Sequence, residues 1–251
     1  FFMEWEPADT WRRMEAWLRE LLPTLGVAPR ALLVVSAHWE EAVFTLNTNA
    51  APGLLFDYYG FPPHTYELQW PAPGAPELAV EVAALLDQAG MAVATDNQRG
   101  LDHGVFVPLK LVCPQADIPV LQLSLQADMD AAGHIALGKA LAPLREQGVL
   151  IIGSGMSFHN IPLMRSNLAH SSPAALAFDQ WLAEIVVLPE AQRNQALTHW
   201  RQAPGARLAH PDAEHLLPLH VVAGAAGRDP GVCAFRDVAM GVPLAGYVFA
   251  G

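Results

Sequence analysis

Histidines in short polar turns are the residues of this sequence best suited to chemistry. The chain has 251 residues and ten histidines, and the turns that hold His38, His103, His159 and His215 are rich in Gly, Ser, Asp or Pro. Neutral imidazole is the commonest side-chain metal ligand, and histidine-rich sites with open positions suit Zn(II) or Fe(II). Each histidine alone has a plain structural explanation, but their shared placement predicts a metal centre.

Two of these histidines follow predicted strands. His38 comes directly after the apolar run 31–36, which predicts a strand buried on both faces. Ligands of open α/β sheets gather at the carboxyl ends of such strands. His159 lies in the segment 153–160, where Phe158 stands at the third glycine position of a dinucleotide fingerprint and no nucleophile elbow fits. Two interpretations remain, a small-residue turn that lets His159 approach an ion and a plain chain reversal.

The other two histidines lie beside acidic residues. Asp212 is expected to cap the helix that follows it, which would place Glu214 and His215 in the first helical turn. The simpler alternative is a capped surface helix in which Glu214 only stabilises the helix dipole. Asp102 precedes His103 and could orient its imidazole, although such pairs also arise by chance.

Strands and helices alternate along the chain and must position these side chains. Predicted strands cover residues 31–36, 43–46, 91–95, 119–125, 149–153 and 244–249, and predicted helices cover residues 7–22, 76–90, 130–147, 173–188, 189–200 and 216–226. Asp9 or Thr10 is expected to cap the first helix, and Pro23 and Gly26 to end it. The segment 50–75 is rich in Pro, Gly and aromatic residues and predicts a long functional loop. The alternation predicts an α/β sandwich in a single domain, residues 1–251, with a central, mostly parallel or mixed sheet flanked by helices.

Composition narrows the classes of partner. Lys and Arg number 14 against 25 Asp and Glu, a net charge of −11 without a basic cluster, which argues against a nucleic-acid partner. The apolar runs are too short to span a bilayer, so we expect no membrane partner and a cytoplasmic location. Cys113 and Cys233 are too few for a disulfide framework or a cysteine zinc site. Their apolar neighbours predict two buried thiols.

A series of motifs resembles one enzyme family. Ser36–Trp39 is similar to the SAHW motif of the DOPA-type (4,5-DOPA) extradiol ring-cleaving dioxygenases, in the LigB-like class III superfamily. Further segments resemble this family in the same order along nearly the whole chain: Asp57–Pro62 (DFxGFP), Tyr66–Pro76, Asp102–Gly104 (DHG), Ile118–Ser124, Ser154–Asn160 (SGNxxHN) and Glu214–Leu219 (EHYLPL).

The resemblance implies a mononuclear non-haem metal site. His38 and His215 match metal ligands, His159 matches a histidine that contacts the metal or acts as a base, and His103 matches an active-site histidine that contacts substrate or dioxygen. The implied metal is Fe(II), with Zn(II) as an alternative at the same site. The implied reaction opens a catechol, such as DOPA, with O2 to a muconic semialdehyde, and His159 or His103 takes a catechol proton. The sequence identifies neither the substrate-binding residues nor the oligomeric state.

The sequence departs from the family pattern at two places. The family has a further metal-ligating histidine in an SHGxP motif before the segment that matches Phe1–Glu4, and this sequence has no histidine before His38. We therefore expect a first strand and its ligand that the sequence does not include. Met156–Phe158 stands where relatives usually have Asn and Val. A zinc-dependent hydrolase and a non-catalytic binding protein on the same scaffold remain alternatives.

Overall fold

The computed structural model describes residues 1–166 and 172–250, which fall into two compact units. Unit 1 consists of Phe1–Asp128 and Pro143–Ser154, and unit 2 consists of Met129–Ala142 and Gly155–Gly251. The single domain expected from the sequence stays a prediction. No helix in the described ranges has the length and apolar character needed to cross a membrane.

A five-stranded sheet forms the centre of unit 1. Its strands are β1 (Ala31–Glu41), β2 (Phe44–Asn47), β3 (Val93–Asp96), β4 (Val120–Gln126) and β5 (Val149–Ser154), in the order β3-β2-β4-β1-β5. β1 pairs in parallel with β4 and β5, β2 pairs in parallel with β3, and the pairing of β2 with β4 is antiparallel. This sheet, with the helices described below, confirms the predicted α/β class.

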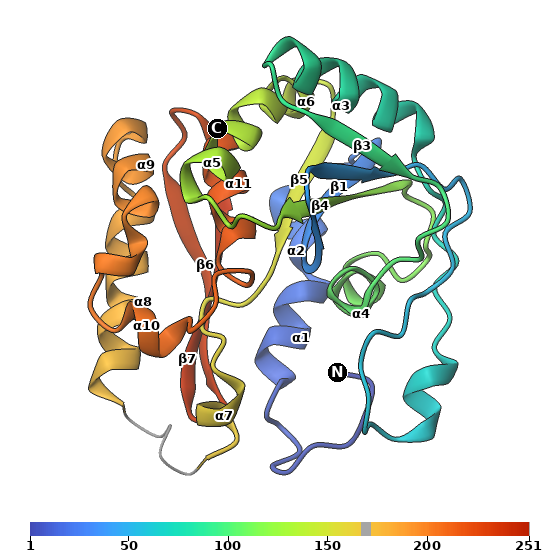
Figure 1. Ribbon diagram of the computed structural model, residues 1–251. Helices are drawn as coiled ribbons and strands as arrows, with labels where there is room; N and C mark the ends of the chain where they lie inside the picture. The colour runs from blue at the N-terminus through green and yellow to red at the C-terminus, as the bar shows by residue number, and fades with distance from the viewer. Residues whose placement is uncertain (167–171, 251) are drawn as a thin grey trace. The chain divides into compact units, whose positions relative to one another are not determined.

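Both faces of the sheet are covered. Leu32, Leu33, Val34 and Val35 of β1 are all fully buried, which fits the unbroken apolar run. Burial of such a side chain contributes roughly 1.5–3 kcal/mol. Leu32 and Val34 share one core cluster with side chains of α1 (Arg12–Arg19) and α4 (His103–Val112). Figure 1 shows these helices on one side of the sheet and α3 (Pro76–Gln88) with α6 (Pro143–Glu146) on the other.

The start of the chain differs from the prediction. The expected helix over 7–22 is two helices, α1 and α2 (Leu21–Leu25), and neither Asp9 nor Thr10 caps α1. The Thr10 hydroxyl instead donates to the Pro7 carbonyl at 2.6 Å. Pro23 lies inside α2, whereas Gly26 ends it with a left-handed φ of 64°.

Unit 2 combines helices with a two-stranded antiparallel sheet. It contains α5 (Ala131–Leu141), α7 (Ile161–Met164), α8 (Pro173–Val186), α9 (Glu190–Thr198), η2 (Trp200–Gln202), α10 (Ala206–Ala209), α11 (Leu217–Ala226), β6 (Gly231–Ala239) and β7 (Val242–Phe249). Figure 1 shows α8 running alongside the β6–β7 hairpin. The sequence predicted β7 but not β6.

Three further expectations are corrected. The predicted helix over 130–147 ends at Leu141, and Pro143 opens a separate helix, because proline cannot continue the hydrogen-bond ladder of a helix. Helix α11 begins only after Leu216, so Asp212 is not its cap. Cys113 is buried as expected, but Cys233 is exposed on β6.

Candidate active site

His38 lies in an irregular part of β1. The sequence predicted that the strand ends before His38, but it continues to Glu41. Five residue steps from Val35 to Glu40 match only two steps along β4, so the intervening residues form a bulge. Bulges re-aim side chains and are common beside active sites. His38 therefore lies just beyond the regular pairing of β1 with β4, and this pairing does not fix its orientation.

A buried carboxylate ties this bulge to the neighbouring elements. Asp102 is fully buried and accepts hydrogen bonds from the Ser36 hydroxyl at 2.7 Å, from Arg99 at 3.3 Å and from the Gln122 amide. Ser36 Oγ in turn accepts from the backbone N–H of His38 at 3.2 Å, and Arg99 donates to the His38 carbonyl at 3.2 Å. Asp102 thus orders the backbone on which His38 stands, rather than the ring of His103 as the sequence suggested.

His103 begins α4 and lies against His38. The two ring centroids are 3.9 Å apart. The space for this contact exists because residue 104 is glycine: a Cβ there would lie 2.7 Å from Cδ2 of His38 and 2.7 Å from the Ser36 hydroxyl. Asp102 caps α4 by accepting from the Val105 N–H.

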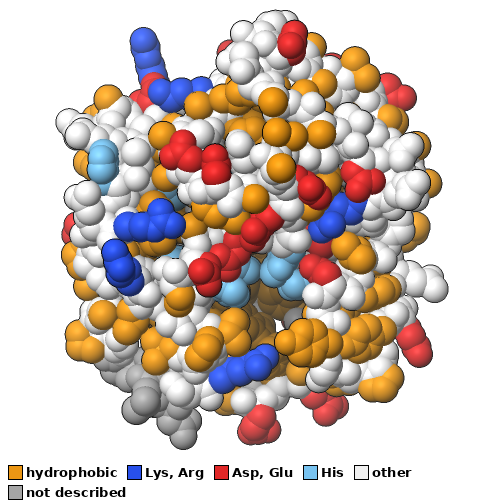
Figure 2. Space-filling model, viewed as in Figure 1, with side chains coloured by type: hydrophobic (Ala, Val, Ile, Leu, Met, Phe, Trp, Pro, Cys, Tyr) orange, Lys and Arg blue, Asp and Glu red, His pale blue; other side chains and the backbone are white. Residues whose placement is uncertain are grey.

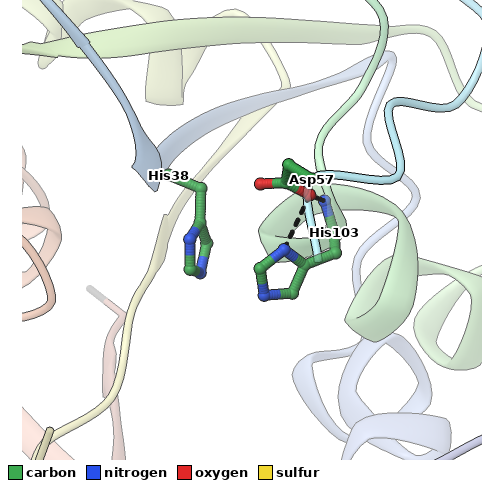
Figure 3. A group of neighbouring side chains, drawn as sticks. All are labelled: His38, Asp57 and His103. Carbon is green, nitrogen blue, oxygen red and sulfur yellow. Dashed lines mark hydrogen bonds and ion pairs between the residues drawn. The ribbon is translucent and has the colours of Figure 1, made fainter. Parts of the chain in front are cut away.

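The partner of the His103 ring is Asp57. Its Oδ1 accepts from His103 Nδ1 at 2.7 Å and from the His103 backbone N–H at 3.0 Å (Figure 3). The side chains of His103 and Asp57 keep 30% and 21% of their accessible area. Burial raises the pKa of the Asp57 carboxyl, but the bonds from His103 together outweigh it, so this pKa lies below its ordinary value. The carboxylate is therefore ionised at neutral pH.

The long loop 50–75 delivers Asp57 to this position. Backbone hydrogen bonds pair the loop with the segment before Asp102: Leu55 donates to Leu101 at 2.7 Å, and Leu101 donates to Gly53 at 2.8 Å. Farther along the loop, the Tyr58 ring meets His103 edge to face, with centroids 5.5 Å apart. The loop contains one short helix, η1 (Pro63–Glu67), and its aromatic side chains pack on α4. The predicted long irregular segment is present, and its functional role stays a prediction.

Unit 2 holds a second histidine group of similar composition. His159 and His215 stack with ring centroids 3.4 Å apart, and His159 Nδ1 lies 3.3 Å from Glu214 Oε1. The bond from His159 lowers the pKa of Glu214 more than burial raises it. Glu214 and His215 stand in the turn before α11, not in its first helical turn as predicted.

The turn after β5 is shaped to fit this group. A Cβ at Gly155 would lie only 2.2 Å from the backbone oxygen of His215, so the small residue permits a close approach of two chain segments. The backbone N–H of His159 donates to the Ala209 carbonyl at 2.9 Å. The His210 ring contacts the Ser157 carbonyl at 3.1 Å, and burial lowers the pKa of His210 to about 4, so this imidazole is neutral. The glycine-rich turn serves segment packing, with His159 placed at its end.

Each unit therefore offers one group of donors that suits a metal ion. His38, Asp57 and His103 present ligand atoms within 4.8 Å of one another, and so do His159, Glu214 and His215. Two imidazoles with one carboxylate match the donor set of non-haem Fe(II) oxygenases. Since His38 belongs to unit 1 and His159 and His215 belong to unit 2, the convergence of these three stays a prediction.

The comparisons with known proteins agree on one family. The family described as the catalytic LigB subunit of aromatic ring-opening dioxygenase matches residues 5–250. This chain belongs to the LigB family. The relatives of this LigB-family protein include a 4,5-DOPA dioxygenase extradiol of Beta vulgaris, 43% identical over 86% of this chain and 79% of the relative. They also include the dioxygenase tasH of Hapsidospora irregularis, 41% identical over 89% and 72%.

A solved structure agrees with the fold. A crystal structure of an uncharacterized Escherichia coli K12 protein aligns with a TM-score of 0.78 at 30% identity and covers 93% of this chain and 91% of its own. The LigB-family chain is therefore an extradiol ring-opening dioxygenase, a non-haem metal-dependent enzyme that acts on an aromatic substrate with O2. This confirms ring opening over the hydrolase and the binding protein that the sequence left open.

The structure adds residues to which the sequence assigned no chemical role. Asp57 was quoted only as part of a motif, and Glu214 was given only an effect on a helix dipole. Both carboxylates contact the Nδ1 of a histidine. The signal for Asp57 was its place in the DFxGFP-like segment of a loop expected to be functional.

Figure 2 shows acidic side chains spread over the face in view with Lys and Arg scattered among them, as the net charge of −11 predicts.

Proposed function

We propose that this dioxygenase opens the ring of a small catechol of the DOPA type and forms a muconic semialdehyde. The observation that carries the proposal is the match to enzymes named 4,5-DOPA dioxygenase extradiol, which are 43% and 42% identical over 86% and 84% of this chain. The aromatic loop supports it, because Tyr58 contacts the His103 ring, Phe56 packs against Tyr58, and such aromatic surface suits an apolar ring.

The proposed metal is Fe(II), held by His38, His159 and His215. The donor chemistry fits, since all three ligands are imidazoles and the ligand atoms of His159 and His215 lie within 4.8 Å of each other. When bound, Fe(II) supplies open positions at which a diol and dioxygen meet. Zn(II) suits the same imidazoles but has no redox chemistry, so a zinc-loaded protein is expected to bind catechol without opening it.

His103 is the proposed proton-handling residue, and His159 takes this role in the alternative in which its Nε2 does not hold the metal. Both have Nδ1 beside a carboxylate oxygen, at 2.7 Å and 3.3 Å, which leaves Nε2 of each ring to face a ligand. A neutral imidazole there accepts a hydroxyl proton of the diol, and the protonated ring is stabilised by its carboxylate. The tilted contact with His38 and the edge-to-face contact with Tyr58 hold the His103 ring in place while the proton moves.

The test is a metal-and-substrate matrix. The protein is stripped of metal, reloaded under argon with Fe(II) or Zn(II), and mixed with L-DOPA, catechol, protocatechuate or tyrosine. We expect one O2 consumed per catechol ring opened, with visible absorbance from the semialdehyde, only in the Fe(II) samples. Tyrosine, which lacks the second hydroxyl, is the matched control. Full Fe(II) occupancy with no oxygen uptake on any diol would refute the proposal.

A further inference from the structure

Asp57 and His103 of unit 1 form a hydrogen-bonded pair in which the two residues have different roles. We infer that Asp57 is a positioning residue, which fixes the ring orientation and the tautomer of His103 so that Nε2 is the nitrogen that meets the substrate. This inference rests on the proposed function and deepens it, since it assigns which atom of His103 takes part and what holds that atom in place.

The first argument is the hydrogen-bond inventory. An ionised carboxylate can only accept, so the 2.7 Å contact with Asp57 requires the proton of the His103 ring to be on Nδ1. The neutral ring then carries its lone pair on Nε2. Figure 3 shows both contacts of Asp57, to the ring and to the backbone of His103, meeting at the same carboxylate oxygen. The two bonds together define where the ring stands relative to its own backbone.

The second argument is that Asp57 is not needed as a helix cap. Asp102 already caps α4 by accepting from the N–H of Val105. The ring bond from His103 to Asp57 therefore adds something that helix formation does not require. The ring also contacts His38, with centroids 3.9 Å apart, and Tyr58, at 5.5 Å. Rings restrained in this way are the ones whose tautomer a neighbouring carboxylate can set.

The third argument is the origin of Asp57. It lies 46 residues before His103, on a loop that is fastened to the segment 99–102 by backbone hydrogen bonds. Asp57 therefore does not meet His103 merely because the two are neighbours in sequence. The fold brings its carboxylate to this residue, where two hydrogen bonds hold it. It acts on the reaction through His103 and not by touching the substrate itself.

The test is a double-mutant cycle. Steady-state kinetics are measured on the catechol that the metal-and-substrate test identifies. Four iron-loaded proteins are compared: wild type, Asp57→Ala, His103→Ala and the double variant. We expect Asp57→Ala to lower kcat roughly 10- to 100-fold, with KM and iron content unchanged. In the His103→Ala background the same change is expected to have no further effect, because the residue through which it acts is gone.

Two more variants sharpen the comparison. Asp57→Asn keeps an oxygen that can accept both bonds, so it is expected to retain more of the rate than Asp57→Ala. Glu67→Gln removes an exposed carboxylate of the same loop and is expected to match wild type. An equal loss of kcat on Asp57→Ala in both backgrounds would overturn the inference, and so would loss of iron from Asp57→Ala, which would make Asp57 a ligand.

A second readout separates this inference from the proposed function. Long-range proton–nitrogen NMR of the metal-free protein reports which ring nitrogen of His103 carries the proton, with the His103→Ala spectrum giving the assignment. We expect the Nδ1–H form in wild type and a shift toward the Nε2–H form in Asp57→Ala. An Nε2–H form in wild type overturns the inference even if catechols are cleaved. Failure to cleave any catechol refutes the proposed function, and the NMR result still decides the role of Asp57.

Discussion

Replacing Gly155 by alanine is expected to damage the unit 2 histidine group through the backbone. A Cβ at this position would lie 2.2 Å from the His215 oxygen, whereas ordinary contact begins near 3.4 Å, so the two segments must separate by about 1.2 Å. A forced shift of this kind in a packed region costs about 1–3 kcal/mol of unfolding free energy. A displacement of about 1 Å in a positioned group lowers a rate by roughly 100-fold.

Two assays read these two effects separately. Urea unfolding followed by circular dichroism measures the stability loss, and oxygen uptake on the preferred catechol measures kcat/KM. Gly53→Ala is the matched control, because a Cβ there meets no atom within 4 Å and its φ is not in the left-handed region. A Gly155→Ala protein with wild-type stability would refute the packing argument. Wild-type turnover together with lost stability would remove His215 from the chemistry.

The other expectations follow from single side chains. His38→Ala and His215→Ala should each bring bound iron, measured by plasma emission, close to zero while the circular dichroism spectrum is unchanged; full iron in both would contradict their role as ligands. His103→Ala should keep its iron and lose about 10²- to 10⁴-fold in kcat, and full activity would exclude it from the mechanism. Burial lowers the pKa of His220 to about 4, so the stability that this neutral ring contributes is complete above pH 6.5 and is lost as the pH falls toward 4. The His220 ring should therefore account for roughly 2 kcal/mol of the stability lost between pH 7.5 and pH 5 in urea unfolding, beside a similar loss from His210, whose pKa burial also lowers to about 4. A flat profile would contradict it.

The regular elements were predictable because their patterns are local. The apolar run of β1 and the proline and glycine that bound α3 are visible in sequence, and both elements are present. Helix α4 was missed because Gly104 and Pro108 are poor helix residues, and tertiary packing overrides their propensities. Strand β6 was missed because Arg236 and Asp237 interrupt its apolar character on an exposed strand.

The sequence singled out the histidines of the two donor groups but not the carboxylates beside them. His38, His103, His159 and His215 were chosen from the composition of their turns, and the structure places them in two donor groups. The carboxylate of Asp57 could not be matched to His103 from sequence, because the contact spans 46 residues and depends on how the loop 50–75 is fastened. Proximity in sequence favoured Asp102 for that role, but Asp102 is committed to buried donors.

The buried carboxylate of Asp102 also constrains how this enzyme can diverge. It accepts from the buried Ser36 and Gln122 and from the partly buried Arg99, so a change at position 102 alone would leave two buried donors without this acceptor, at about 1–3 kcal/mol for each. Asp102 can be replaced during evolution only if the residues that donate to it change at about the same time. The four positions are therefore expected to covary as a block across descendants of this enzyme. The side chain of Tyr59 is 91% exposed, so substitutions at this position can begin to change the substrate without disturbing these buried groups.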